Sequence, residues 1–250
     1  MARPARDDRE VAYVALGDSI SIDDYAGGRG RGGASLLASN LDEDFPAWHG
    51  HDLGPQPFLL LATDGATSRT LLEQQLPALR QRGVPPQVVT VTIGGNDVLG
   101  CYGDTPSALR AADAALRRVD EGMSVLRSLG GSSVDIVLGT VYDPSDGTAD
   151  AAKVGLPPWP DVVDVIAHLN DGLRVVAGRH GALVAEIHAT FLGHGLASGD
   201  PGQPDARPTN RDLWYCLVIE PNAWGADGVR RAFWKALGRQ EPEDLTTERV

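Results

Sequence analysis

The stretch VAYVALGDSI, residues 11–20, places an apolar run directly before a Gly-Asp-Ser turn. A near-continuous apolar run of this kind is typical of a strand that is covered on both faces. Ser19 then stands just beyond the end of the strand. A serine in that position is either a helix cap or a nucleophile, and the rest of the chain has to distinguish the two.

Four more runs resemble the first, and helical patterns separate them. The runs cover 57–62, 87–93, 134–141 and 182–188, and the helical patterns cover 68–82, 106–129, 161–179 and 226–237. Strands and helices that alternate in this way predict an α/β fold, with helices on both faces of a parallel sheet.

The expected helices carry recognisable end signals. Thr67 and Thr105 are candidate N-caps, and Gly130 ends the second helix. Pro77 is expected to break or kink the first helix. Residues 142–160 and 195–212 are long irregular stretches, which in compact domains are usually functional or mobile.

Length and composition restrict the class of protein. The 250 residues suffice for one α/β domain, expected over 1–250 with a core at about 11–240 and short tails. A net charge of −12 argues against binding to nucleic acid or anionic membranes. We see no signal peptide and no apolar run approaching the ~18 residues of a membrane span, so we expect a cytoplasmic protein. Cys101 and Cys216 are then expected to be reduced thiols.

Small or amide-bearing residues follow the first three strands. Ser19 follows the first, Gly65 the second and Asn96 the third. Ligands bind beyond the carboxyl ends of strands in such sheets. The N–H groups of Ser19 and Gly65 and the side-chain amide of Asn96 could therefore converge on a developing oxyanion, as acyl transfer requires.

These three blocks resemble those of the SGNH, or GDSL-type, hydrolases. The matching residues are Gly17-Asp18-Ser19-Ile20, Gly65 within DGATS, and Ile93-Gly94-Gly95-Asn96-Asp97. The resemblance implies a flavodoxin-like three-layer α/β/α domain with a five-stranded sheet in the order 2-1-3-4-5. It also implies Ser19 as nucleophile, with Ser19, Gly65 and Asn96 as the oxyanion hole. Members of the family act on esters, thioesters, acylated sugars and lipids.

Residues 217–225 of this chain differ from the last sequence block of the family. The family reads Asp-x-x-His-Pro-Asn-x-x-Gly, whereas residues 217–225 read LVIEPNAWG. Glu220 thus stands at the position of the catalytic histidine, and Leu217 at that of its orienting aspartate.

Three interpretations of this departure remain open. Glu220 is itself the general base, its pKa raised by burial. Alternatively His188 or His194, near the exit of the fifth strand, supplies the base and Glu220 orients it. In the third interpretation the base is lost, and the protein binds an acylated or carbohydrate ligand without turnover.

The sequence therefore predicts a serine-dependent hydrolase or acyltransferase that forms an acyl-enzyme at Ser19. We expect a small-molecule ester or acyl substrate. We expect no metal, no organic cofactor, no nucleic-acid partner and no membrane insertion.

Overall fold

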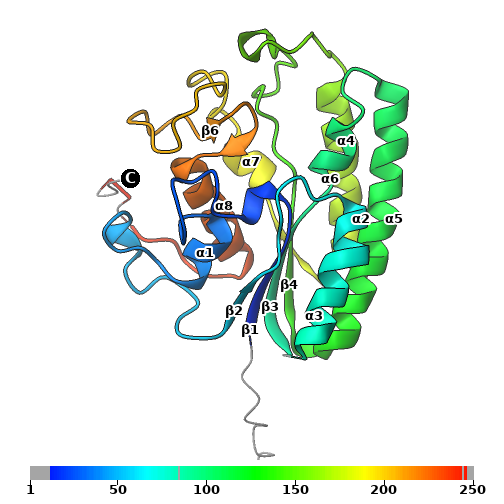
Figure 1. The fold of residues 1–250 in the computed structure, drawn as a ribbon, viewed down its shortest axis with the longest axis vertical. Helices are drawn as coiled ribbons and strands as arrows, with labels where there is room; N and C mark the ends of the chain where they lie inside the picture. Colours follow the sequence, from blue (N-terminus) through cyan, green and yellow to red (C-terminus); the bar gives the residue numbers. More distant parts are fainter. Residues whose placement is uncertain (1–11, 84, 244, 247–250) are drawn as a thin grey trace, which may run out of the picture.

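The computed structural model describes residues 12–83, 85–243 and 245–246. The expected N-terminal tail and the last residues of the expected C-terminal tail lie outside the described residues. Within these ranges, a central sheet lies between two groups of helices (Figure 1).

Five parallel strands form the sheet in the order β2-β1-β3-β4-β5, which confirms the expected topology. The strands are β1 (Ala12–Gly17), β2 (Phe58–Leu60), β3 (Pro86–Thr92), β4 (Asp135–Gly139) and β5 (Leu183–Ala185). The run at 182–188 is a strand only as far as Ala185, because residues 187–191 turn into a short helix.

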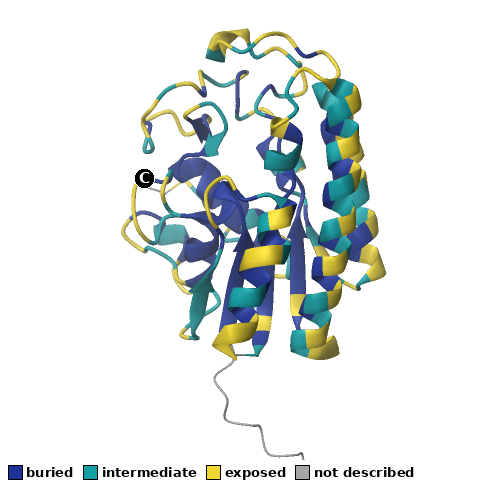
Figure 2. Ribbon diagram, turned by 45° about the vertical axis from the view of Figure 1, so that its right-hand side comes forward, coloured by how far each residue is buried: buried dark blue, intermediate teal, exposed yellow. Residues whose placement is uncertain are grey.

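Successive residues of β1 face opposite layers of the molecule. Val14 and Leu16 pack in one hydrophobic cluster, and Tyr13 and Ala15 in the other. All four are fully buried, which explains why the run is apolar throughout rather than alternating. Figure 2 shows the central strands β1, β3 and β4 as mostly buried, whereas the edge strand β2 is only half-buried.

The helices form the two outer layers. One layer holds α2 (Ser68–Thr70), α3 (Leu76–Arg82), α5 (Thr105–Gly130) and α6 (Val162–Arg179), and the other holds α1 (Gly33–Ala38), α7 (Ile187–Phe191) and α8 (Ala223–Ala236) (Figure 1). The three-layer α/β/α arrangement is therefore confirmed. Within the described ranges, no helix combines the length and the apolar character needed to cross a membrane.

Two helix starts differ from those expected. Asp104, not Thr105, caps α5, because its side chain accepts the Ser107 N–H at 3.1 Å. Helix α8 begins at Ala223 rather than at 226, because the Asn222 side chain accepts the N–H groups of the second and third helical residues. The cap at Thr67 is confirmed, with Thr70 completing a capping box.

A small hairpin outside the main sheet was not expected. It pairs β6 (Tyr215–Cys216) with β7 (Glu220–Pro221) in antiparallel orientation, and it leads directly into α8. Cys216 lies opposite Glu220 in this pairing. The hairpin therefore determines the position of Glu220, which stands where the family has its catalytic histidine.

Candidate active site

The loops after β1, β2 and β3 meet at the carboxyl edge of the sheet. The Thr63 N–H donates to the Gly17 carbonyl at 3.0 Å, and the Asp18 N–H donates to the Thr92 carbonyl at 2.9 Å. The strand order reverses between β1 and β3, so this is the switch point at which α/β sheets bind ligands.

Gln75 joins the end of β1 to the loop after β2, because its side-chain nitrogen donates to the Thr63 hydroxyl at 3.4 Å. Its side-chain oxygen accepts the Gly17 N–H, and its side-chain nitrogen donates to the Gly17 carbonyl, both at 2.8 Å. Gln75 lies in a π-helical turn, Leu71–Gln75, that separates α2 from α3. Such turns are frequent at functional sites. Gln75 was not expected at the site, although the break expected at Pro77 indicates an irregular turn in this segment.

Ser19 is not the cap of the turn in which it lies. Asp18 fills that role, since its Oδ1 accepts the Ile20 N–H at 3.2 Å. The Ser19 side chain instead lines an apolar cavity, and the residue is 7% exposed. A ligand in that cavity would therefore lie against Ser19.

The structure brings Asn96 to the same cavity as Ser19. One N–H of the Asn96 amide donates to the Ala66 carbonyl at 3.0 Å, which leaves the second N–H for a ligand. This bond places Asn96 beside the loop of Gly65, whose φ of +64° is a conformation that suits glycine. Asp97 links the loop after β3 to the start of α2, because its carboxylate accepts the N–H and the hydroxyl of Ser68 at 2.8 and 2.7 Å.

Glu220 is held by a strained turn. Leu217 and Val218, in the loop of the hairpin, have φ values of +50° and +81°. Each such residue costs about 1–3 kcal/mol, and such strain clusters at functional sites. The turn is held by N–H bonds from Leu217 to Gln203 and from Val218 to Pro201, at 3.0 and 2.7 Å.

The structure brings the Glu220 carboxyl to the Ser19 hydroxyl. Burial raises the pKa of Glu220 above its usual value, a hydrogen bond from Ser19 lowers it, and the charge of Asp64 raises it. The Oε2 atom of Glu220 is buried without a hydrogen-bond partner among the described residues. Among the residues that the structure describes, no basic side chain forms an ion pair with Glu220. A carboxylate in this setting is a stronger base than one in water.

Tyr25 and Asp64 complete the surroundings of Glu220. Burial, a hydrogen bond to Asp64 and the charge of Glu220 raise the pKa of Tyr25 to about 12, so its hydroxyl keeps its proton. The hydrogen bond of Asp64 with Tyr25 and the effect of its charge on Glu220 were not expected, although Asp64 directly precedes Gly65 in the sequence.

A second buried carboxyl, that of Asp18, lies close enough to Glu220 to be affected by its charge. Burial raises the pKa of Asp18 to about 7, hydrogen bonds from Thr92 and Ile20 lower it, and the charge of Glu220 raises it. Asp18 is only 2% exposed. The folded protein therefore holds this proton more tightly than the unfolded chain does.

The substitution Asp18→Asn is expected to flatten the pH dependence of stability. Because the folded-state pKa lies above the unfolded one, the free energy of unfolding of the unsubstituted protein falls as pH rises from about 4 to about 7, by as much as ~4 kcal/mol. Urea unfolding at pH 5 and pH 8 should show roughly 2–3 kcal/mol of this loss. The exposed Asp135→Asn serves as the control. Equal losses in the Asp18→Asn and Asp135→Asn variants would contradict the assignment.

The structure places both candidate histidines in other contacts. His188 lies in α7, where its Nδ1 is 3.2 Å from the Val141 carbonyl. His194 stacks on Trp214, with ring centroids 3.7 Å apart, and its Nδ1 is 2.9 Å from the Asp212 carbonyl. Neither residue lines the cavity that contains Ser19.

Fold and site together define a three-layer α/β protein with a serine and a buried carboxyl at the carboxyl edge of its sheet. The model of the GDSL-like lipase/acylhydrolase family matches residues 15–227, and the chain belongs to that family.

The proteins to which this chain is similar include lipases and esterases. A lipase from Streptomyces rimosus is 29% identical over 76% of this chain and 74% of its own length. Phospholipase A1 from Streptomyces albidoflavus has a TM-score of 0.57 at 23% identity, covering 92% of this chain and 98% of that one. A variant of an acetyl xylan esterase from Geobacillus stearothermophilus has a TM-score of 0.61 at 18% identity, covering 92% and 95%. The family and the Streptomyces rimosus lipase support ester hydrolysis as the general activity, and the two solved structures show the shared fold.

Proposed function

We propose that this protein hydrolyses carboxylic esters through an acyl-enzyme at Ser19, with Glu220 as the general base. The observation that carries the proposal is the pairing of the Ser19 hydroxyl with a buried carboxyl whose pKa is raised and which has no basic partner among the described residues. The pairing supports the first of the three interpretations of the last block.

In the first half of the reaction, Glu220 takes the hydroxyl proton as Ser19 Oγ attacks the ester carbonyl. The negative charge that develops on the carbonyl oxygen is stabilised by the N–H groups of Ser19 and Gly65 and by the Asn96 amide. The tetrahedral intermediate then collapses, and the alcohol leaves with the proton from Glu220. In the second half, Glu220 takes a proton from water, the hydroxide attacks the acyl carbon, and Ser19 recovers its proton as the acid departs.

The burial of Glu220 makes a carboxylate suitable for this role. A carboxylate with its ordinary pKa is a weak base at neutral pH, and a general base works best with a pKa near the working pH. Desolvation moves the pKa in that direction. An orienting aspartate at position 217 would add another negative charge near Glu220, whereas Leu217 adds none.

The substitution Asn96→Ala should lower kcat by about 10²–10³-fold with little change in KM, because an oxyanion donor acts mainly in the transition state. Steady-state kinetics on p-nitrophenyl butyrate measures both constants. A melting curve controls for loss of the bond to Ala66. A raised KM with unchanged kcat would assign Asn96 to ground-state binding instead.

Turnover of p-nitrophenyl butyrate and covalent labelling by a fluorophosphonate test the proposal together. The protein should do both. If it does neither at any pH from about 5 to 9, the alternative holds, in which the protein binds an acylated or carbohydrate ligand without turnover. A small-molecule ester as partner, the single-domain organisation and the cytoplasmic location stay predictions.

A further inference from the structure

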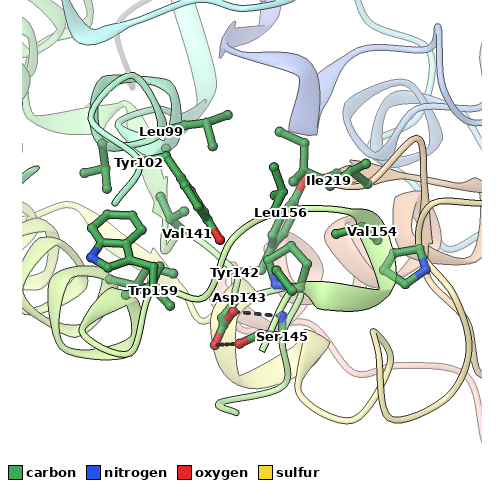
Figure 3. Close-up of a pocket in the computed structure, with 18 of the residues that line it drawn as sticks. Leu99, Tyr102, Val141, Tyr142, Asp143, Ser145, Val154, Leu156, Trp159 and Ile219 are labelled. Carbon is green, nitrogen blue, oxygen red and sulfur yellow. Dashed lines mark hydrogen bonds between the residues drawn. The ribbon is translucent and has the colours of Figure 1, made fainter. Parts of the chain in front are cut away.

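The cavity beside Ser19 has a volume of about 140 Å³. It lies between the loop after β4, the start of α6 and the helix α4 (Gly95–Leu99) that follows β3. Its walls are mostly apolar side chains, among them Leu99, Tyr102, Leu156, Trp159, Val162 and Ile219. Figure 3 shows Tyr102 and Trp159 on one side of the cavity and Val154 and Ile219 on the other.

We propose that this cavity binds the acyl chain of the ester and selects chains of about six carbon atoms. The inference rests on the proposed function, because it assumes that Ser19 attacks the acyl carbon. It adds the part of the substrate that enters the cavity and the length that fits there.

The position of the catalytic groups indicates the acyl chain rather than the alcohol. Ser19 and Asn96 both line the cavity, so a carbonyl held by them directs its own chain into that space. The alcohol oxygen has to reach the group that returns the proton, which is Glu220. Glu220 does not line the cavity, although its neighbour Ile219 does.

Away from Ser19 and Asn96, polar side chains in the cavity wall are already paired. Asp143 accepts the N–H and the hydroxyl of Ser145, both at 2.9 Å, and the Tyr142 hydroxyl donates to the Ile219 carbonyl at 2.5 Å. The Tyr102 hydroxyl donates to the Pro157 carbonyl at 2.8 Å. A ligand in this space thus finds apolar surface and few free hydrogen-bonding groups, as an alkyl chain requires.

Volume and wall rigidity set the length of the chain. A dry apolar cavity of ~150 Å³ in another protein holds benzene, so about 140 Å³ corresponds to roughly six carbons. Tyr102 and Trp159 pack edge to face with centroids 5.1 Å apart, and the Trp159 indole donates to Thr105 at 2.9 Å. These contacts fix the aromatic wall and oppose expansion for a longer chain.

A series of p-nitrophenyl esters from acetate to laurate tests the inference, because only the acyl chain changes. For the unsubstituted protein, kcat/KM should be highest near hexanoate. Val162→Phe fills the cavity and should lower kcat/KM on hexanoate at least ~10-fold while sparing acetate. The neighbouring Val163 does not line the cavity, so Val163→Phe should leave the profile unchanged. Leu156→Ala enlarges the cavity and should move the optimum to longer chains, which gives a second readout if Val162→Phe does not fold.

Three outcomes would overturn the inference. One is a profile that does not depend on acyl length; another is the same effect of Val162→Phe and Val163→Phe on every ester. The third is an effect of Val162→Phe and Leu156→Ala on the alcohol length of alkyl butyrates but not on acyl length, which would place the alcohol in the cavity. In all three the ester is still hydrolysed and the proposed function stands. A protein that hydrolyses no ester and takes no fluorophosphonate label would refute both.

Discussion

Replacement of Ser19 by alanine should reduce ester hydrolysis by at least ~10⁴-fold, with the fold preserved. The substitution removes a single oxygen atom, and this atom forms the bond to the acyl carbon in the proposed reaction. The cap of the turn is provided by Asp18, so the turn should survive the substitution. Hydrolysis of p-nitrophenyl hexanoate, with a melting curve for both proteins, measures the effect.

Ser21 provides a matched control for this prediction. It lies in the same short turn and is also buried, but its hydroxyl is 2.9 Å from the Thr92 hydroxyl. Ser21→Ala should therefore change stability more than it changes kcat. If the Ser19→Ala variant keeps more than about a tenth of the activity, the nucleophile lies elsewhere.

The substitution Glu220→Gln should lower kcat by about 10²–10⁴-fold, because glutamine has the shape of glutamate but cannot take a proton. The same substitution should not destabilise the protein at neutral pH. Burial raises the pKa of Glu220, so the ionised side chain costs free energy in the folded state, and a neutral amide removes that cost. Activity kinetics and urea unfolding at pH 7 measure the two effects.

The pH profile and the histidine variants provide the controls for Glu220. Glu220 works as a base only when deprotonated, so kcat/KM should fall as pH drops through its raised pKa, above the usual range of a carboxyl. In a Glu220→His variant the fall should lie near pH ~6.5, the ordinary pKa of histidine. His188→Ala and His194→Ala should retain activity. Full activity in Glu220→Gln together with its loss in His188→Ala or His194→Ala would assign the base to that histidine.

The convergence of the strand exits could be predicted because it depends on local features. The apolar run before Ser19 identifies a central strand, and the carboxyl ends of parallel strands share one edge. Two of the residues placed there, Ser19 and Asn96, do line one cavity. Helix α5 was likewise predictable, because its apolar stripe and its terminal Gly130 are read along one segment.

Features that depend on distant contacts could not be predicted in the same way. Gln75 reaches Gly17 from a turn 58 residues away in the chain, and no apolar period marks it. The caps at Asp104 and Asn222 depend on which of several neighbouring polar side chains accepts an N–H group. Competition of this kind is decided by backbone geometry, not by residue type alone.

The setting of Glu220 was the least predictable part of the site. Its pKa depends on burial, on the Ser19 hydroxyl and on the charge of Asp64. These groups come from segments far apart in the chain, and a short hairpin with two residues at positive φ brings Glu220 to them. The sequence therefore left Glu220, His188 and His194 as alternatives.

The rate at which a fluorophosphonate labels the protein, with the modified residue mapped by mass spectrometry, tests the pairing of Ser19 with Glu220 most directly. Labelling requires an activated nucleophile but no particular acyl chain, so it does not depend on the substrate. We expect an adduct on Ser19 that forms at least ~100-fold more slowly in Glu220→Gln than in the unsubstituted protein. An adduct on another residue, or equal rates in the two proteins, would contradict it.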